Sequence, residues 1–176
     1  GMLLLSPVFL YVAIRVKLSS PGPILYRQER IGYKGKPFTM LKFRSMFEDA
    51  EQNGPALSST TDPRITPWGR HMRKWRLDEF PQLWNILRGE MSLVGPRPER
   101  PQFVEKFKEE IPRYMIKHQV RPGMTGWAQI NGYRGDTSIR KRIEYDLYYI
   151  ENWSMGFDFR IMFLTIFKGF INKNAY

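Results

Sequence analysis

Two adjacent carboxylates, Asp78 and Glu79, are the residues of this chain whose types and setting best suit chemistry. They directly follow a basic, tryptophan-containing run that ends at Arg76. Carboxylate oxygens are the ligands that Mg²⁺ prefers, and an aspartate can act as a covalent nucleophile. One carboxylate could therefore attack a phosphoryl group while the pair holds a divalent metal.

The same pair is also compatible with ordinary helix capping. Hydrophobic periodicity predicts a helix just beyond it, with Leu83, Trp84 and Leu87 on one face. Asp78 would then be the N-cap, and Pro81 would lie in the first turn, where a missing N–H costs nothing. Free N–H groups and the helix dipole favour negative charge at this position. The local sequence leaves capping and catalysis both open.

Arg97 is the second candidate, because it lies between Pro96 and Pro98. The two prolines restrict the backbone on either side of it. A pre-positioned, planar and always charged guanidinium suits phosphate binding. A proline-rich turn that carries a surface arginine would have the same sequence.

Composition restricts the partners. The chain has 176 residues, no cysteine and a net charge of +11. The absence of cysteine excludes disulfides and thiolate metal sites. The charge predicts an anionic partner, which could be nucleic acid, an acidic lipid surface or a phosphorylated small molecule.

The expected fold is α+β, with amphipathic helices around a small antiparallel hairpin. Alternating hydrophobicity predicts strands over residues 24–31 and 38–46, joined by a turn at 33–36. Thr66 and Pro67 are typical of a helix start, with an apolar stripe at Trp68, Met72 and Trp75. Further helices are expected over residues 103–114, 139–150 and 153–171.

The apolar segment from Met2 to Ile14 is too short to cross a bilayer, which takes about 20 residues. Ser6 and Pro7 interrupt it, and an interior proline kinks a helix. It could be a core helix, an interfacial helix, or one limb of a helix that enters the membrane and turns back.

Seven motifs resemble the bacterial sugar transferases, the monotopic polyprenyl-phosphate phosphoglycosyl transferases, and they follow that family's order. They occupy residues 19–23 (SSPGP), 42–46 (KFRSM), 62–66 (DPRIT), 77–82 (LDEFPQ), 93–98 (LVGPRP), 121–127 (RPGMTGW) and 146–149 (DLYY). The resemblance implies transfer of a sugar-1-phosphate from a UDP-sugar to undecaprenyl phosphate, with release of UMP. This reaction initiates the synthesis of exopolysaccharide, capsule or O-antigen.

By that resemblance, Asp78 forms a covalent phosphosugar intermediate, and Glu79, together with Asp78, serves a Mg²⁺ site. Arg97 binds phosphate, Arg76 and Arg121 are weaker candidates for that role, and Asp146 matches an acidic position near the site. The chemistry agrees with the residues, since phosphoryl transfer depends mainly on positioning and charge neutralisation.

The resemblance also implies a location at the cytoplasmic face of the bacterial inner membrane. Residues 1–18 would be the remnant of a re-entrant membrane helix that breaks at Ser6 and Pro7, with most of its ingoing limb missing. Residues 19–176 would form the catalytic domain. The sequence leaves open both homo-oligomer formation and the identity of the sugar.

Two non-catalytic functions fit the composition as alternatives. A nucleic-acid-binding domain would explain the charge and the aromatic content, but it does not explain an acidic pair within the basic region. We therefore expect no nucleic-acid partner. A peripheral membrane module would use its basic face on anionic lipid.

Overall fold

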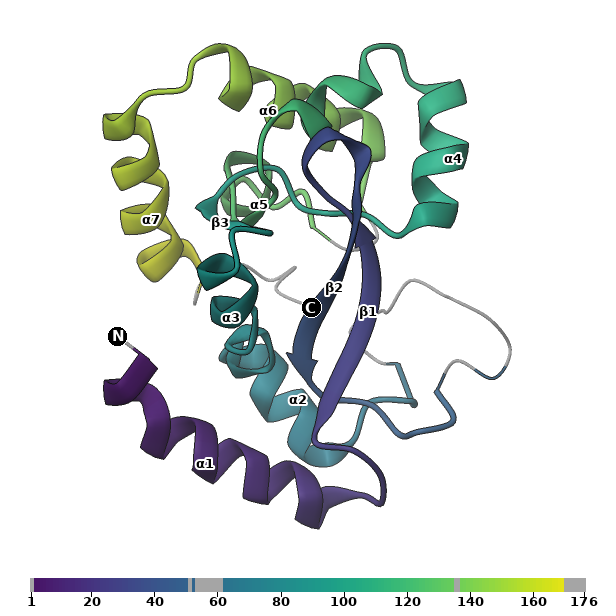
Figure 1. The fold of residues 1–176 in the computed structure, drawn as a ribbon, viewed down its shortest axis with the longest axis vertical. Coiled ribbons are helices and arrows are strands. Elements are labelled where there is room, and N and C mark those ends of the chain that lie inside the picture. Colours follow the sequence, from purple (N-terminus) through teal and green to yellow (C-terminus); the bar gives the residue numbers. More distant parts are fainter. Residues whose placement is uncertain (1, 51, 53–61, 135–136, 170–176) are drawn as a thin grey trace.

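A long β-hairpin forms the centre of the molecule, and helices cover both of its ends (Figure 1). This computed structural model describes residues 2–50, 52, 62–134 and 137–169, with side chains described for 6–167 within those ranges. Strands β1 (Leu25–Ile31) and β2 (Pro37–Phe43) pair antiparallel, from Leu25 opposite Phe43 to Ile31 opposite Pro37. A 3₁₀ turn, η1 (Tyr33–Gly35), joins them. The predicted hairpin and its turn are confirmed, although β2 ends earlier than expected.

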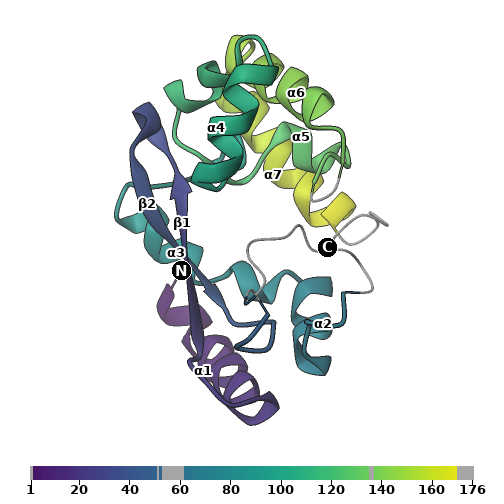
Figure 2. The same ribbon diagram turned by 90° about the vertical axis from the view of Figure 1, so that its right-hand side faces the viewer.

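One end of the hairpin is covered by helices α1 (Met2–Ser19) and α2 (Pro67–Lys74) (Figure 2). Their contact with β2 forms an apolar core of Val12, Val16, Phe43 and Met72. Thr66 caps α2 as predicted, because its side-chain oxygen accepts a hydrogen bond from the Gly69 N–H at 2.9 Å. The packing at this end of the molecule fixes the position of the segment that leads from α2 to Asp78.

Helix α1 has one face in this core and another in solvent. Its exposed apolar side chains are Val8, Leu10, Tyr11, Ile14 and Leu18. The helix includes Ser6 and Pro7, where we expected a break, and the re-entrant hairpin itself is not shown. Among the described residues, no helix is long and apolar enough to cross a membrane.

The other end of the hairpin is covered by the C-terminal half of the chain. Helices α4 (Pro101–Glu110) and α6 (Ile139–Glu151), with the 3₁₀ helix η3 (Tyr114–Gln119), enclose Val104, Ile111, Tyr114 and Ile143. Helices α5 (Trp127–Ile130) and α7 (Met155–Gly169) enclose Val94, Ile130, Tyr149 and Ile161. The three predicted helices are therefore present, with shifted ends, and the predicted end at residue 171 lies outside the described residues.

A short parallel pair of strands, β3 (Ser92–Val94) and β4 (Gly123–Thr125), was not expected. A Cβ added to Gly123 would lie 2.1 Å from the backbone nitrogen of Gly95, so only glycine allows the two segments to lie this close. At Gly123, glycine thus allows one backbone segment to pack directly against another.

The predicted N-cap at Asp78 is wrong. Asp78 and Glu79 lie in a separate 3₁₀ turn, η2 (Leu77–Glu79), and helix α3 (Gln82–Leu87) begins only after Pro81. The chain enters this turn through Arg76 in the left-handed conformation, with φ 55°. The Glu79 N–H bonds to the Arg76 carbonyl, so the local turn uses the donors that a longer helix would have left free.

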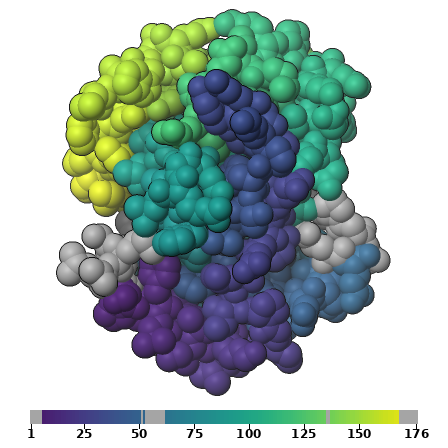
Figure 3. Space-filling model, in the orientation of Figure 1, coloured from purple at the N-terminus to yellow at the C-terminus, as the bar shows by residue number. Residues whose placement is uncertain are grey.

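Helix α3 buries its polar side. Asn85 is buried and bonds to β2, because its Oδ1 accepts from the Leu41 N–H at 3.1 Å and its Nδ2 donates to the Thr39 carbonyl at 2.8 Å. Trp84 and Leu87 are exposed, and the helix lies on the surface beside the hairpin (Figure 3). The hairpin therefore fixes α3 through hydrogen bonds, and the apolar stripe of this helix remains available on the outside.

Replacing Gly69 with alanine should destabilise the fold, because a Cβ at this position of α2 would lie 2.0 Å from the Ser45 carbonyl oxygen. We expect the free energy of unfolding, measured by urea denaturation, to fall by about 1–3 kcal/mol or more. Gly156→Ala is the matched control, because that helical glycine has no atom within 4 Å of an added Cβ. The control should gain up to about 1 kcal/mol from helix propensity. Equal stability of the two variants would contradict the close contact between α2 and the segment that follows β2.

Candidate active site

Glu79 lies at the centre of a cluster of cations and has no exposed surface. Its Oε1 atom faces three cationic groups and its Oε2 atom faces one. The partners are Arg97 at 2.6 Å, Arg134 at 2.9 Å and Lys42 at 3.3 Å on Oε1, and Arg76 at 3.2 Å on Oε2. We call Glu79 and these four cations the Glu79 cluster.

Distant parts of the chain supply this cluster. Lys42 comes from β2, Arg76 precedes η2, Arg97 follows β3, and Arg134 follows α5. Gln129 joins two of them, because its Oε1 accepts from Arg97 at 3.1 Å and from Arg76 at 3.4 Å. The site therefore forms only when both ends of the hairpin are covered.

The electrostatics of the cluster keep Glu79 ionised. Burial would raise the pKa of Glu79, but the surrounding arginines and Lys42 outweigh burial and hold the pKa well below its ordinary value of 4.5. Burial also lowers the pKa of Arg134 to about 10 and that of Lys42 to about 8, although Glu79 opposes both changes. With a pKa of about 8, Lys42 loses its charge at a lower pH than Arg134, whose pKa is about 10.

Asp78 is adjacent to the cluster but differs from Glu79 in its partners. It is 6% exposed, and among the described residues no hydrogen bond or ion pair engages its carboxylate. Its negative charge acts on Lys42, Arg73, Arg97 and Arg134. Asp78 is thus an unpaired carboxylate in a positive field, which is the state that a nucleophile requires.

The charges of the site do not cancel. The four cations of the Glu79 cluster exceed the two carboxylates by two positive charges. The excess lies in a largely buried place, where solvent screens it less than at the surface. This arrangement fits an anion with more than one charge, and phosphate oxygens are the natural partners of arginine forks.

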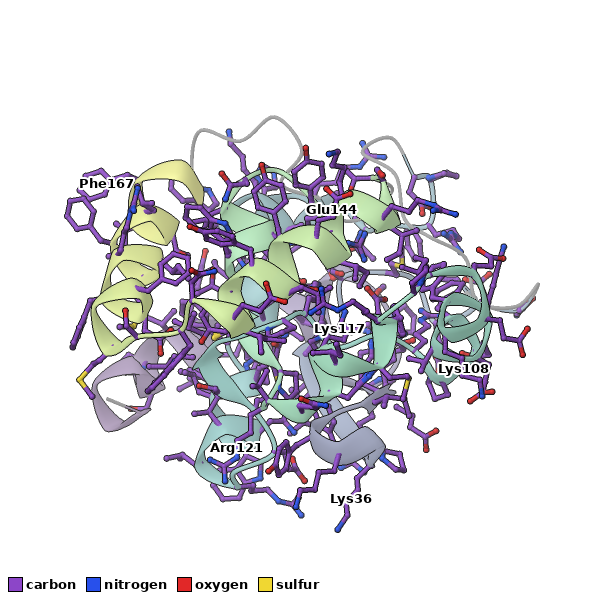
Figure 4. The ribbon with its side chains drawn as sticks, turned by 90° about the horizontal axis from the view of Figure 1, so that it is seen from above. Lys36, Lys108, Lys117, Arg121, Glu144 and Phe167 are labelled. Atoms are coloured by element: carbon purple, nitrogen blue, oxygen red, sulfur yellow. The ribbon has the colours of Figure 1, made fainter. Side chains whose placement is uncertain are left out.

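The structure brings together four of the predicted site residues, Asp78, Glu79, Arg76 and Arg97. Arg121 is exposed, and within the described ranges no ion pair links it to either carboxylate. Figure 4 shows Arg121 toward the edge of the view and Lys117, the partner of Asp146, near its centre, and Lys117 is buried. Asp146 is 2% exposed and pairs with Lys117 at 3.4 Å, outside the Glu79 cluster.

Lys42 and Arg134 were missed by the sequence analysis. Lys42 is in a strand that we had predicted, but most charges on a half-buried hairpin are solvated, so its residue type gave no signal. Arg134 follows a glycine-rich loop and has no local feature that distinguishes it from the other basic residues. These two residues can be identified only when distant segments of the chain meet in the folded protein.

The donor chemistry of Asp78 and Glu79 fits Mg²⁺. This ion keeps several waters and commonly binds through one or two carboxylates plus substrate phosphates. No group of three or more histidine, cysteine, aspartate or glutamate side chains gathers as a metal cluster within the described part of the chain. Asp78 is unpaired and could bind the metal directly. Glu79 would first have to release one of its arginine or lysine partners.

The model of the bacterial sugar transferase family matches residues 1–172. The chain belongs to the bacterial sugar transferase family. The resemblance that the seven motifs indicated is therefore confirmed.

Curated relatives of this sugar transferase carry names that specify different sugars. It is 50% identical over 179 residues to the UDP-glucose:undecaprenyl-phosphate glucose-1-phosphate transferase of Escherichia coli (strain K12), which covers 99% of this chain and 39% of the relative. It is 48% identical to the UDP-N-acetylgalactosamine-undecaprenyl-phosphate N-acetylgalactosaminephosphotransferase of Aeromonas hydrophila, covering 93% of this chain and 39% of the relative. The chain thus spans about two fifths of the length of these relatives.

The Glu79 cluster predicts a specific acid sensitivity. Because the folded-state pKa of Glu79 lies below its ordinary value of 4.5, its ionisation stabilises the fold above that pH. This stabilisation is lost as the pH falls through the lowered pKa. Glu79→Gln should lower the free energy of unfolding at pH 7 by about 3 kcal/mol, because four cations lose their counter-charge.

The variant should also show a weaker dependence of stability on pH below 4.5 than the unchanged chain. Denaturation with urea at a series of pH values measures both effects. Glu105→Gln is the control, because Glu105 forms an exposed pair with Lys108. If the two variants have the same stability profile, Glu79 is not the counter-charge of the cluster.

Proposed function

We propose that the chain transfers a sugar-1-phosphate from a UDP-sugar to undecaprenyl phosphate and releases UMP. The observation that carries this proposal is the unpaired Asp78 carboxylate next to the Glu79 cluster. A nucleophile is thereby placed beside an excess of positive charge that can hold a diphosphate. The names of the relatives support the same donor and acceptor classes.

The first step forms a bond between an Asp78 carboxylate oxygen and the sugar-bearing phosphorus of the donor. The bond from that phosphorus to the oxygen of the departing UMP breaks, and UMP leaves with the bonding electrons. A carboxylate nucleophile needs no general base, and the positive charges around Asp78 favour the approach of the anionic donor. The product of this step is an acyl phosphate that joins the Asp78 carboxyl group to the sugar-1-phosphate.

The second step frees Asp78. An oxygen of the lipid phosphate attacks the same phosphorus, and the Asp78–phosphorus bond breaks to give sugar diphosphate–lipid. In both steps, negative charge develops on oxygens around phosphorus, where Arg97, Arg134 and Lys42 can neutralise it. Glu79 holds these cations in place before the substrate arrives, which reduces the reorganisation needed on binding.

Mg²⁺ is the cofactor that we propose, held by Asp78, Glu79 and the substrate phosphates. When bound, it would supply further neutralisation of the diphosphate charge. The cations of the Glu79 cluster come from four separate segments of the chain, and together they would orient the diphosphate.

A membrane surface is the proposed place of the reaction, at the cytoplasmic face of the bacterial inner membrane. Helices α1 and α7 expose apolar side chains, and on α7 these include Phe159, Phe163, Ile166 and Phe167. Arg15 of α1 lies 4.6 Å from the centre of the Trp68 ring of α2, so a cation and an aromatic ring lie together where these two helices meet. Such mixtures are typical of surfaces that contact lipid head groups.

The test of the function is UMP release from a panel of UDP-sugars in the presence of Mg²⁺ and undecaprenyl phosphate. The panel should include UDP-glucose and UDP-N-acetylgalactosamine, and it should be run with and without the upstream segment of the longer relatives. Release of UMP that depends on the lipid supports the proposal. Absence of release from every donor in both forms would overturn it and favour a non-catalytic membrane module.

Asp78→Asn should abolish turnover and the covalent sugar-phosphate adduct, because an amide is not an effective nucleophile. Mass spectrometry of the intact protein, mixed with UDP-sugar but no lipid, measures the adduct. Asp49→Asn is the control, because this aspartate is exposed and lies outside the cluster. Detection of the adduct on the Asn variant would refute Asp78 as the nucleophile.

The lowered pKa of Lys42 predicts an alkaline limit of activity. Because its pKa is about 8, kcat/KM should fall as the pH rises through 8 and Lys42 loses its charge. We expect a loss of about tenfold, corresponding to one hydrogen bond to a charged group. Lys42→Arg keeps the charge and should remove this limb of the pH profile, as measured by initial rates of UMP release. An unchanged alkaline limb in the variant would assign the limb to another group.

A further inference from the structure

A second buried group of charges lies between β1, η3 and α6, and the proposed chemistry does not use it. Its members, each with a side chain no more than 14% exposed, are Arg30, Glu99, Lys117, Arg142 and Asp146. Glu99 faces Arg142 at 2.5 Å and Arg30 at 3.8 Å, and Lys117 faces Asp146 at 3.4 Å. We call these five residues the Glu99 cluster.

The Glu99 cluster is joined to the Glu79 cluster by only one intervening residue. Arg97, Pro98 and Glu99 are consecutive, so the segment that carries Arg97 into one cluster carries Glu99 into the other. The two side chains also influence each other, because Glu99 raises the pKa of Arg97. A displacement of Glu99 would therefore be transmitted directly to Arg97.

Several contacts hold this segment against β1. The Ile31 N–H donates to the Glu99 carbonyl at 2.9 Å, and the Arg30 guanidinium donates to the Pro98 carbonyl at 3.2 Å. Pro96 and Pro98 restrict the backbone on both sides of Arg97. On the side facing α6, the ion pair from Glu99 to Arg142 connects helix and segment.

The charges of the Glu99 cluster suit positioning better than stabilisation. Burial would raise the pKa of Glu99, but Lys117, Arg142 and Arg30 outweigh burial and lower it, so the carboxylate stays ionised. A buried ion pair contributes little net stability, since desolvation offsets the attraction. Its benefit is a defined geometry, because a buried charge is satisfied in few arrangements.

We propose that Arg142 is a positioning residue that acts through Glu99 to fix the guanidinium of Arg97. Helix α6 thereby takes part in the site although none of its described side chains contacts Glu79. Asp146, one turn further along α6, belongs to the same Glu99 cluster through its ion pair with Lys117. The inference rests on the proposed function only for the role of Arg97 in holding phosphate.

The test is a double-mutant cycle with Arg142→Gln and Arg97→Gln, measured as kcat/KM for the UDP-sugar. In the unchanged background, Arg142→Gln should lower kcat/KM by about 10- to 100-fold, as expected for a misplaced binding group. In the Arg97→Gln background, the same change should cost less than about threefold, because the residue that Arg142 positions is already absent. Equal losses in the two backgrounds would overturn the proposal.

Two further variants separate positioning from a general loss of structure. Arg142→Lys retains the charge and should recover part of the lost activity, with kcat recovering more than the thermal midpoint. Arg113→Gln is the matched control, because it removes an exposed ion pair with Glu151 at the other end of α6, and it should leave kcat/KM unchanged. If Arg142→Gln does not fold, Glu99→Gln replaces it in the same cycle with the same expected coupling.

A readout without turnover distinguishes failure of this inference from failure of the proposed function. The side-chain Nε–H signal of Arg97 in ¹⁵N-arginine-labelled protein should be sharp and slow to exchange, and Arg142→Gln should broaden it. An unchanged Arg97 signal in the variant would overturn positioning by Arg142, whatever the enzymatic result. If no UDP-sugar releases UMP but the signal broadens, the proposed function fails and the positioning inference stands.

Discussion

The geometry of the site depends on the ion pairs that the buried carboxylate of Glu79 forms with the surrounding cations. Four cations from four separate segments of the chain converge on it, and they would repel one another if Glu79 were neutral. Burying a carboxylate is unfavourable unless opposite charges surround it. The arginines and Lys42 therefore need Glu79, and Glu79 needs them. This mutual dependence ties the hairpin, the 3₁₀ turn η2 and the C-terminal half of the chain into one arrangement.

The same arrangement gives two neighbouring carboxylates different surroundings. Glu79 points into the cluster and is fully paired, so it organises the cations. Asp78 lies beside it without a partner in the described chain, so its oxygens remain available to a substrate. A separation of this kind between a paired and an unpaired carboxylate requires a backbone that turns sharply between them. The 3₁₀ turn that begins after the left-handed Arg76 supplies this backbone.

The proline-rich segment after β3 connects this site with the rest of the C-terminal half. Arg97 and Glu99 extend from it into two groups of buried charges, and the glycines at 95 and 123 let it lie directly against β4. Close backbone contact and fixed proline conformations leave the segment few ways to move. The rigidity of the site therefore comes from elements that lie outside the acidic motif itself.

Local sequence determined the parts of this structure that depend on local physics. The hairpin, its turn, the Thr66 cap and the later helices follow from periodicity and turn chemistry, and the acidic pair and Arg97 could be selected by residue type and spacing. Sequence reasoning failed where tertiary contacts decide. It placed Asp78 at a helix N-cap and gave no signal for Lys42, Arg134 or the parallel pair β3–β4. The roles proposed for Arg121 and Asp146 stay predictions, and the structure places both residues outside the Glu79 cluster. Ordering of charges around a buried carboxylate is a long-range electrostatic effect, and it is defined only when residues 42, 79, 97 and 134 meet in the folded chain.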